Sequence, residues 1–222
     1  MFLKVGHRGA RAYEIENTLN SFKRAIELGA NAIEMDVRKS QDGKLIIIHD
    51  NNLKRVFGKD VLVNQKTLKE LKQLTENKIP TLHEALKFIN QSVEKILVEL
   101  KEIGYEKEVL NAVKKEKLRE SVIIVSFHEQ ALSKIRAFDK EIETGLIYAK
   151  HRNPIDTALI FKAKYLVPLY RFVHTKNVEN AHNKNLKMIV WTINTEQEAK
   201  EYKAKGVDGI ASDKPDILQG LL

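Results

Sequence analysis

The chain has 222 residues, which is long enough to bury a sizeable core in one domain, and it contains no cysteine, so disulfides, thiolate metal sites and a cysteine nucleophile are excluded. A formal net charge of +8 raises the question of nucleic-acid binding, but the basic residues are interleaved with Glu, as in KEIGYEKEVLNAVKKEKLRE. We therefore expect no nucleic-acid partner, although the charge can attract small anions. No apolar run approaches the length that spans a bilayer, so we expect no membrane insertion and a cytoplasmic location.

Short apolar runs recur along the chain at the length expected for strands, with helical patterns between them. Eight runs are predicted to be strands: 2–5, 32–37, 96–100, 122–125, 143–148, 164–168, 187–191 and 208–211. A further run at 45–48 is predicted to return beside the second strand. Strands that alternate with helices pair in parallel, and eight such units predict a TIM (β/α)₈ barrel. An open doubly wound sheet is the alternative, although no glycine-rich dinucleotide loop supports it.

Several predicted helices begin with a capping-box pattern, in which a hydroxyl and a carboxylate three residues later satisfy free backbone N–H groups. The pairs are Thr67 and Glu70, Thr81 and Glu84, Ser126 and Glu129, and Thr195 and Glu198. The only long excursion runs from about residue 50 to 80, where we expect a small cap beside the mouth of the barrel. We interpret residues 1–222 as a single barrel domain that includes this insertion after the second strand.

The segment 31–50, NAIEMDVRKSQDGKLIIIHD, carries three candidate catalytic groups. Glu34 and Asp36 lie two residues apart in an extended run, so their side chains point to the same face. Asp-Gly at 42–43 predicts a tight hairpin turn. If these two residues form the loop, Gln41 pairs with Lys44, and His49 lies directly across from Asp36.

The active site of a TIM barrel lies at the carboxyl ends of its strands, where several chemically interesting residues of this chain also fall. Three carboxylates from neighbouring strands, Glu34, Asp36 and Glu99, form an oxygen-only set that suits Mg²⁺ or Ca²⁺. The alternative is that each carboxylate pairs with Lys or Arg. Lys101 and Arg8 would bind a phosphodiester beside the metal, and for Lys101 the alternative is an ion pair with Glu99.

Two of the seven histidines end an apolar extended run and should reach the mouth of the barrel. His7 and His49 could act as base and acid on opposite sides of a phosphorus atom near neutral pH. The alternative for each is a hydrogen-bonded structural histidine. His128, just after the fourth strand, is a possible third member, and the other four are predicted to lie on surface helices or in loops.

Seven segments, in this order along the chain, resemble the glycerophosphodiester phosphodiesterase family. They are HRGARAYEIENTLNSF, EMDVRKSQDGKLIIIHD, IPTLHEAL, LVELK, SFHEQAL, WTIN and GVDGIASDKPD. The resemblance covers nearly the whole chain. It implies a TIM barrel, in glycerol and lipid metabolism, that hydrolyses deacylated phospholipid diesters to glycerol 3-phosphate and an alcohol.

The resemblance also implies a role for each matching residue. Glu34, Asp36 and Glu99 would hold a divalent metal, and His7 and His49 would carry out acid/base catalysis. Arg8 and Lys101 would contact the phosphate, and Trp191 would line the glycerol end. Glu16 and Asn17 match a supporting motif, and Asp208 and Asp213 match a scaffold motif. Packing at the rim of the barrel is the alternative for Trp191. Ile15 stands where the family usually has proline and Ala12 replaces a frequent glycine, and both changes concern loop stiffness.

We therefore expect a small-molecule glycerophosphodiester as the substrate of a chain that acts as a monomer or homodimer. One alternative is a lysophospholipase D-like or inositol phosphodiester-cleaving barrel. A lysophospholipase D needs an apolar surface near the mouth, and residues 50–66 contain no obvious exposed apolar stretch. A non-catalytic barrel that binds phosphate esters is the other alternative, although such a protein would have no need of the metal carboxylates.

Overall fold

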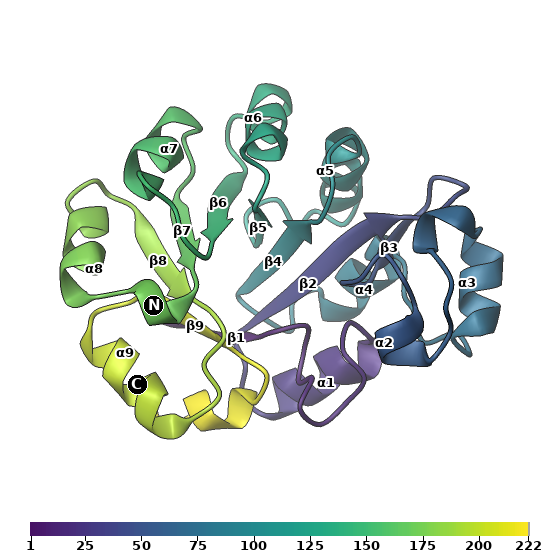
Figure 1. Ribbon diagram of the computed structural model, residues 1–222, viewed down its shortest axis with the longest axis horizontal. Helices are drawn as coiled ribbons and strands as arrows, with labels where there is room; N and C mark the ends of the chain where they lie inside the picture. Colours follow the sequence, from purple (N-terminus) through teal and green to yellow (C-terminus); the bar gives the residue numbers. More distant parts are fainter. Residues whose placement is uncertain (222) are drawn as a thin grey trace.

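The computed structural model describes residues 1–221 and shows a closed ring of parallel strands with helices around its outside (Figure 1). The eight barrel strands are β1 (Leu3–Gly6), β2 (Ala32–Lys39), β4 (Lys95–Leu100), β5 (Val122–Ser126), β6 (Glu143–Tyr148), β7 (Tyr165–Pro168), β8 (Lys187–Val190) and β9 (Gly209–Ser212). Their order is β1-β9-β8-β7-β6-β5-β4-β2, and β1 pairs with β2 to close the ring. The predicted TIM barrel is confirmed, and the open sheet is wrong.

The outer helices pack their apolar faces onto the strands. They are α1 (Leu19–Glu27), α4 (Leu82–Ile89), α5 (Glu106–Lys115), α6 (Glu129–Phe138), α7 (Pro154–Ile160), α8 (Thr175–His182) and α9 (Glu196–Ala204), with short 3₁₀ turns η2 (Tyr170–Phe172) and η3 (Pro215–Leu218). A separate apolar cluster that includes Val5, Leu97 and Ile189 fills the interior of the barrel. Alternate strand residues thus point to the two layers of core. Within residues 1–221, no helix is both long and apolar enough to cross a membrane.

The helix starts follow the predicted caps except at one position. Thr81 and Glu84 form both halves of a capping box, as do Thr67 and Glu70, and the Thr195 side chain accepts a hydrogen bond from the backbone of its helix. The prediction for Ser126 is wrong, because Ser126 still belongs to β5. Its hydroxyl donates to the Leu100 carbonyl at 2.8 Å, and α6 begins three residues later.

The hairpin after β2 forms with a register one residue away from the predicted one. Strand β3 (Leu45–Ile47) runs antiparallel to β2, and Val37 pairs with Ile47. Gln41, Asp42 and Gly43 all lie in the loop, and Gly43 has a φ of 75°, which a three-residue hairpin loop requires at this position. As a result the Asp36 carbonyl accepts a hydrogen bond from the Ile48 amide, and the predicted pairing of His49 with Asp36 is wrong.

The insertion consists of α2 (Lys54–Phe57), the 3₁₀ turn η1 (Val63–Gln65) and α3 (Leu68–Leu74). It lies beside β3, to one side of the ring of strands (Figure 1). A separate apolar cluster holds it there, and its buried members are Ile46, Ile48, Leu53, Val63, Leu71 and Ile79. Because two of these residues belong to the returning arm of the hairpin, the insertion is packed directly against the segment that leads into His49.

Candidate active site

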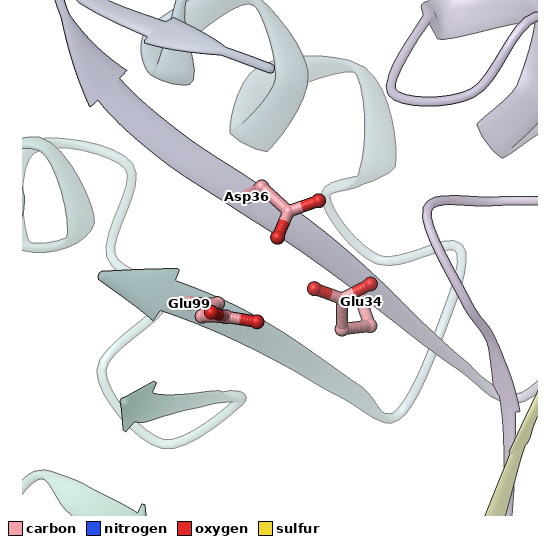
Figure 2. A group of neighbouring side chains, drawn as sticks. All are labelled: Glu34, Asp36 and Glu99. Carbon is pink, nitrogen blue, oxygen red and sulfur yellow. The ribbon is translucent and has the colours of Figure 1, made fainter. Parts of the chain in front are cut away.

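Three buried carboxylates converge from β2 and β4 because of the register between these strands. Asp36 pairs with Glu99 across the two strands, and Glu34 lies two residues before Asp36 on the same face. Figure 2 shows the three side chains pointing toward one another from the two strands. One oxygen of each carboxylate lies within 4.8 Å of the others. The spacing is small enough for a single cation to contact all three.

The three neighbouring acids have pKa values that are shifted in different directions. Burial, together with the charges of Asp36 and Glu99, raises the pKa of Glu34 well above its ordinary value. Burial and the charge of Asp36 likewise raise the pKa of Glu99 to about 7. Burial acts in the same direction on Asp36, but Arg8 and Lys101 outweigh it and lower its pKa to about 2. The raised pKa values of Glu34 and Glu99 favour their protonated forms, and a bound cation would favour the carboxylates instead.

The donor atoms fit a hard divalent cation. Glu34 Oε1 is buried and finds no hydrogen-bond partner among the residues that the structure describes, and Asp36 Oδ1 is buried without a hydrogen bond there, although the Lys101 Nζ atom lies 3.4 Å away. A buried acceptor without a partner is costly, and a cation at this position would satisfy both oxygens. The set contains only carboxylate oxygens, which favours Mg²⁺ or Ca²⁺ over metals that prefer nitrogen or sulfur.

Two cationic side chains lie beside the carboxylates. The Arg8 Nε atom is 3.1 Å from Asp36 Oδ2, while its backbone N–H donates to Glu34 Oε2 at 2.9 Å. The Lys101 Nζ atom is 2.6 Å from Glu99 Oε1 and 3.4 Å from Asp36 Oδ1. The predicted alternative for Lys101, an ion pair with Glu99, is thus present. Both cations also line the cavity at the mouth, where an anion would meet them.

The loop after β1 holds Arg8 in an uncommon backbone conformation. Arg8 has a φ of 54°, in the left-handed region that side chains other than Gly rarely adopt. The Arg8 carbonyl accepts hydrogen bonds from the Asn17 amide at 3.0 Å and the Ser21 hydroxyl at 2.8 Å. At Gly9, where φ is 82°, a Cβ atom would lie 2.3 Å from the Ser21 hydroxyl. The His-Arg-Gly segment is therefore shaped by close contact with α1.

The His7 side chain is 13% exposed, and a carboxylate from the other end of the chain orients it. Its Nδ1 atom is 2.7 Å from Asp213 Oδ1, and its Nε2 atom is 4.0 Å from Glu34 Oε2. Asn194 donates to the other Asp213 oxygen at 2.9 Å. Because a carboxylate can only accept, Nδ1 carries the proton and Nε2 faces the acids. Burial lowers the pKa of His7, against the opposing effect of Asp213.

His49 has a similar arrangement. Its Nδ1 atom is 2.6 Å from Asp50 Oδ1, and its side chain lines the same cavity as His7. The residue reaches this position although the hairpin register differs from the predicted one, because β3 ends at Ile47 and the backbone then leaves the strand direction. Burial lowers the pKa of His49, and the charge of Asp36 opposes that effect.

These groups surround a cavity of about 120 Å³ at the carboxyl ends of the strands. Part of the lining is polar and ionisable and consists of His7, Arg8, Glu34, His49, Glu99 and Lys101. The rest, which we call the apolar wall, consists of Leu97, Val125, Phe127, Ile147, Val167, Trp191 and Ala211. The Trp191 indole donates to the Val167 carbonyl at 2.8 Å, and its ring meets Phe127 edge-on at 5.8 Å. The site therefore combines an anion-binding side with a side suited to carbon atoms.

The remaining predicted residues lie behind this cavity or outside it. Asn17 donates to Asp36 Oδ2 at 2.8 Å, and Glu16 accepts from Arg8 at 3.0 Å. His128 is exposed, its Nε2 atom is near the Lys101 carbonyl, and it is absent from the described lining of the cavity. Asp208 is away from the site and contacts His182 at 2.9 Å.

Sequence reasoning missed the contacts of Asp50 and Asp213 with the two imidazoles. Asp213 directly follows β9, so its place at the carboxyl end of a barrel strand was a signal that could have marked it. Asp50 directly follows His49 in the chain, but its distance from the ring depends on the path that the backbone takes after β3.

Comparison with known proteins agrees with this geometry. The model of the "Glycerophosphoryl diester phosphodiesterase family" matches residues 7–217. A glycerophosphodiester phosphodiesterase from Caldanaerobacter subterraneus is 32% identical, with 99% of this chain and 97% of the relative covered.

Two solved structures are similar over nearly their full length. The glycerophosphodiester phosphodiesterase from Thermotoga maritima has a TM-score of 0.84 and 31% identity, with 100% of this chain and 99% of that chain covered. A phosphodiesterase from Oleispira antarctica, in complex with the product sn-glycerol-3-phosphate, has a TM-score of 0.87 and 28% identity, with 98% and 95% covered. Together with the match of the family model over nearly the whole chain, these similarities show that the protein belongs to the glycerophosphoryl diester phosphodiesterase family.

Proposed function

We propose that this enzyme hydrolyses glycerophosphodiesters to glycerol 3-phosphate and an alcohol, and that the reaction requires a divalent cation. The observation that carries the proposal is a cavity lined by two imidazoles, two cationic side chains and the carboxylates of Glu34 and Glu99, which cluster with the buried Asp36. Family membership supports the substrate class, as does the product complex of the Oleispira antarctica phosphodiesterase.

The metal in this proposal is Mg²⁺ or Ca²⁺, held by Glu34, Asp36 and Glu99. A cation bound there would act as a Lewis acid on a phosphoryl oxygen and neutralise part of its charge. Arg8 and Lys101 add positive charge from the protein itself, and the Arg8 guanidinium can contact two phosphate oxygens. The substrate phosphate would therefore lie between the carboxylate cluster and these two side chains.

The two imidazoles divide the proton transfers. One takes a proton from the attacking oxygen as a new P–O bond forms, and the other gives a proton to the leaving alkoxide as the second P–O bond breaks. The attacking oxygen belongs to water, or to the neighbouring hydroxyl of the glycerol, in which case a cyclic phosphate forms first and water opens it. With Nδ1 directed to Asp213 in His7 and to Asp50 in His49, each ring uses Nε2 for these transfers.

The apolar wall gives the proposal a place for the glycerol carbons. Trp191 and Phe127 form part of this wall, where their rings meet edge-on at 5.8 Å, and the Lys101 Nζ atom lies 5.9 Å from the centre of the Phe127 ring. In this role Trp191 binds substrate. Glu16 and Asn17 support Arg8 and Asp36 from behind.

The test is an assay that detects glycerol 3-phosphate released from glycerophosphocholine. We expect EDTA to abolish release and Mg²⁺ or Ca²⁺ to restore it. Substitution of His7→Ala or His49→Ala should lower kcat by about 10²- to 10⁴-fold, the usual size of an acid/base contribution. The surface variant His83→Ala is the control, since this histidine pairs with Glu116 away from the site. Full turnover after EDTA treatment, or in either active-site variant, would refute the proposal.

A second candidate substrate is a lysophospholipid, which has an acyl chain on the glycerol. The observation in its favour is Phe127, whose residue surface is 44% exposed at the apolar wall of the cavity. This apolar surface lies on the β5–β8 side of the mouth and not in residues 50–66. Turnover of lysophosphatidylcholine at a rate comparable to that of glycerophosphocholine would favour this candidate, and turnover of the deacylated diester alone would exclude it.

A further inference from the structure

Arg55, on the one-turn helix α2 of the insertion, binds two carboxylates at once. Its Nε atom donates to Asp50 Oδ2 at 2.6 Å. Its two terminal nitrogens donate to the two oxygens of Glu16, at 2.8 Å and 2.6 Å. The planar guanidinium thus uses three donors on two acids, in the fork geometry for which Arg is suited.

Each of these carboxylates continues to a group at the candidate active site. The other oxygen of Asp50 lies 2.6 Å from His49 Nδ1. Glu16 lies 3.0 Å from the terminal nitrogen of Arg8. Arg55, Asp50 and Glu16, which we call the Arg55 bridge, therefore connect one candidate acid/base histidine to the candidate phosphate-binding arginine.

The Arg55 bridge stabilises the charge of a buried carboxylate. The Glu16 side chain is only 8% exposed, and it lies between cations that include Arg8 and Arg55. Burial would raise the pKa of Glu16, but hydrogen bonds from Arg55 and the charge of Arg8 keep it below its ordinary value. Without Arg55, Glu16 and Asp50 would lose the donor that holds both in one orientation. The carboxylate of Asp50 could then rotate, and the ring of His49 with it.

The packing of the insertion holds the backbone of Arg55 in place. Leu53, directly before α2, is fully buried in the cluster that also contains Ile48, one residue before His49. Helix α2 ends at Phe57, and Gly58 caps it with a left-handed φ of 68° and an amide that donates to the Lys54 carbonyl. None of the residues that line the cavity in the described chain belongs to segment 50–80. The insertion thus stands next to the site without forming its wall.

We propose that Arg55 is a positioning residue: through Asp50 it fixes the ring of His49, through Glu16 it fixes Arg8, and the insertion serves to hold it. The predicted cap thereby takes on a different function, because in this proposal it organises catalytic groups and does not line the cavity. The inference rests on the proposed roles of His49 and Arg8 in diester hydrolysis.

The experiment compares Arg55→Met and Arg55→Lys with the control Arg119→Met. Arg119 pairs with Asp139 far from the site, and its side chain is 44% exposed against 45% for Arg55. For each chain, kcat and KM are measured with glycerophosphocholine, and the melting temperature is recorded. The ring tautomer of His49 is read by NMR of the metal-free, ¹⁵N-histidine-labelled chain, with assignment from a His49→Gln chain.

We expect Arg55→Met to lower kcat by about 100-fold, the cost of a small misplacement of a reacting group, while KM changes much less. His49 should change from the single Nδ1–H tautomer to a mixture. Arg55→Lys should recover only part of kcat, since one ammonium cannot reproduce three donors in a plane. Arg119→Met should match the parent chain.

The tautomer comparison separates this inference from the proposed function. If the parent chain releases no glycerol 3-phosphate, the proposed function fails, but the NMR result still decides whether Arg55 holds His49. An unchanged His49 tautomer in both Arg55 variants overturns the inference. A kcat within twofold of the parent in either variant also overturns the inference. So does a decrease in activity that matches the decrease in folded protein in both variants.

Discussion

At the scale of single residues, the two imidazoles of the site have the same kind of hydrogen bond. Each directs Nδ1 to a carboxylate and leaves Nε2 for the cavity. A carboxylate in this position selects one tautomer and stabilises the imidazolium when it forms. Asp213 is therefore more than the scaffold residue that the sequence resemblance implies.

The substitution Asp213→Asn tests this role. An amide can donate to Nδ1 as well as accept from it, so the ring of His7 loses its single tautomer. We expect kcat to fall by about 10²- to 10⁴-fold, with little change in KM or in folding. The control is Asp216→Asn, since Asp216 is a nearby acid that accepts from the exposed Tyr13 hydroxyl. Wild-type kcat in the Asp213 variant would show that the contact is only structural.

The pH dependence of kcat/KM follows from the same two rings. Burial lowers the pKa of both His7 and His49, so each ring stays neutral to a lower pH than free histidine does. The base must be neutral to act, and a lowered pKa therefore extends activity toward acid. We expect the acid limb of kcat/KM to have its midpoint below about pH 6.5. A midpoint above that value, measured at constant ionic strength and saturating cation, would contradict this account.

At the scale of elements, the sequence predicts the carboxylate cluster because strand geometry is regular. Alternation places Glu34 and Asp36 on one face, and parallel neighbours bring Glu99 to the same end of the barrel. The hairpin shows the limit of such reasoning. The Asp-Gly pair marks the position of the turn correctly. Whether the loop has two or three residues depends on the whole hairpin, and the observed three-residue loop shifts the strand register by one residue from the predicted one.

Helix starts can be read from local sequence when the hydroxyl is free to cap. Thr81 caps α4 because its hydroxyl accepts from the Glu84 amide, and the Glu84 carboxylate closes the box. Ser126 has the same spacing to an acid, but the strand places its hydroxyl against the Leu100 carbonyl. The difference depends on tertiary contact, which spacing alone does not contain.

Removal of the Thr81 cap should have a measurable effect on stability. In the variant Thr81→Ala, the amide of Glu84 loses its acceptor, and we expect a loss of about 1 kcal/mol in the free energy of unfolding. The exposed Thr175, which is the first residue of α8 and does not cap it, provides the control Thr175→Ala. Urea unfolding of the two variants measures the difference. Equal stabilities would contradict the importance of the cap.

Contacts between distant segments explain what the sequence does not predict. The ring of His7 meets Asp213 across 206 positions, and Arg55 meets Glu16 across 39. Both contacts depend on the closed barrel and on the packing of the insertion against β3. No periodicity or local motif specifies which of the many acids and bases of the chain will meet in this way.

At the scale of the whole molecule, the barrel mouth is divided between two chemistries. The ionisable groups come from β1, β2 and β4 and from the end of the hairpin, whereas most of the apolar lining, including Phe127, Ile147, Val167 and Trp191, comes from the β5–β8 side. The closed ring brings these two halves together around one small cavity. A phosphodiester with a short carbon skeleton matches this division, because its charge and its carbon atoms need opposite surroundings.

The most direct test of this account is anomalous diffraction from crystals of the protein soaked with Mn²⁺, a probe for the proposed cation. We expect one strong peak within about 2.6 Å of oxygens from Glu34, Asp36 and Glu99, in the space that His7 and His49 border. A peak elsewhere would contradict the central claim. So would the absence of a peak at this cluster, with Lys101 and Arg8 still paired to the acids.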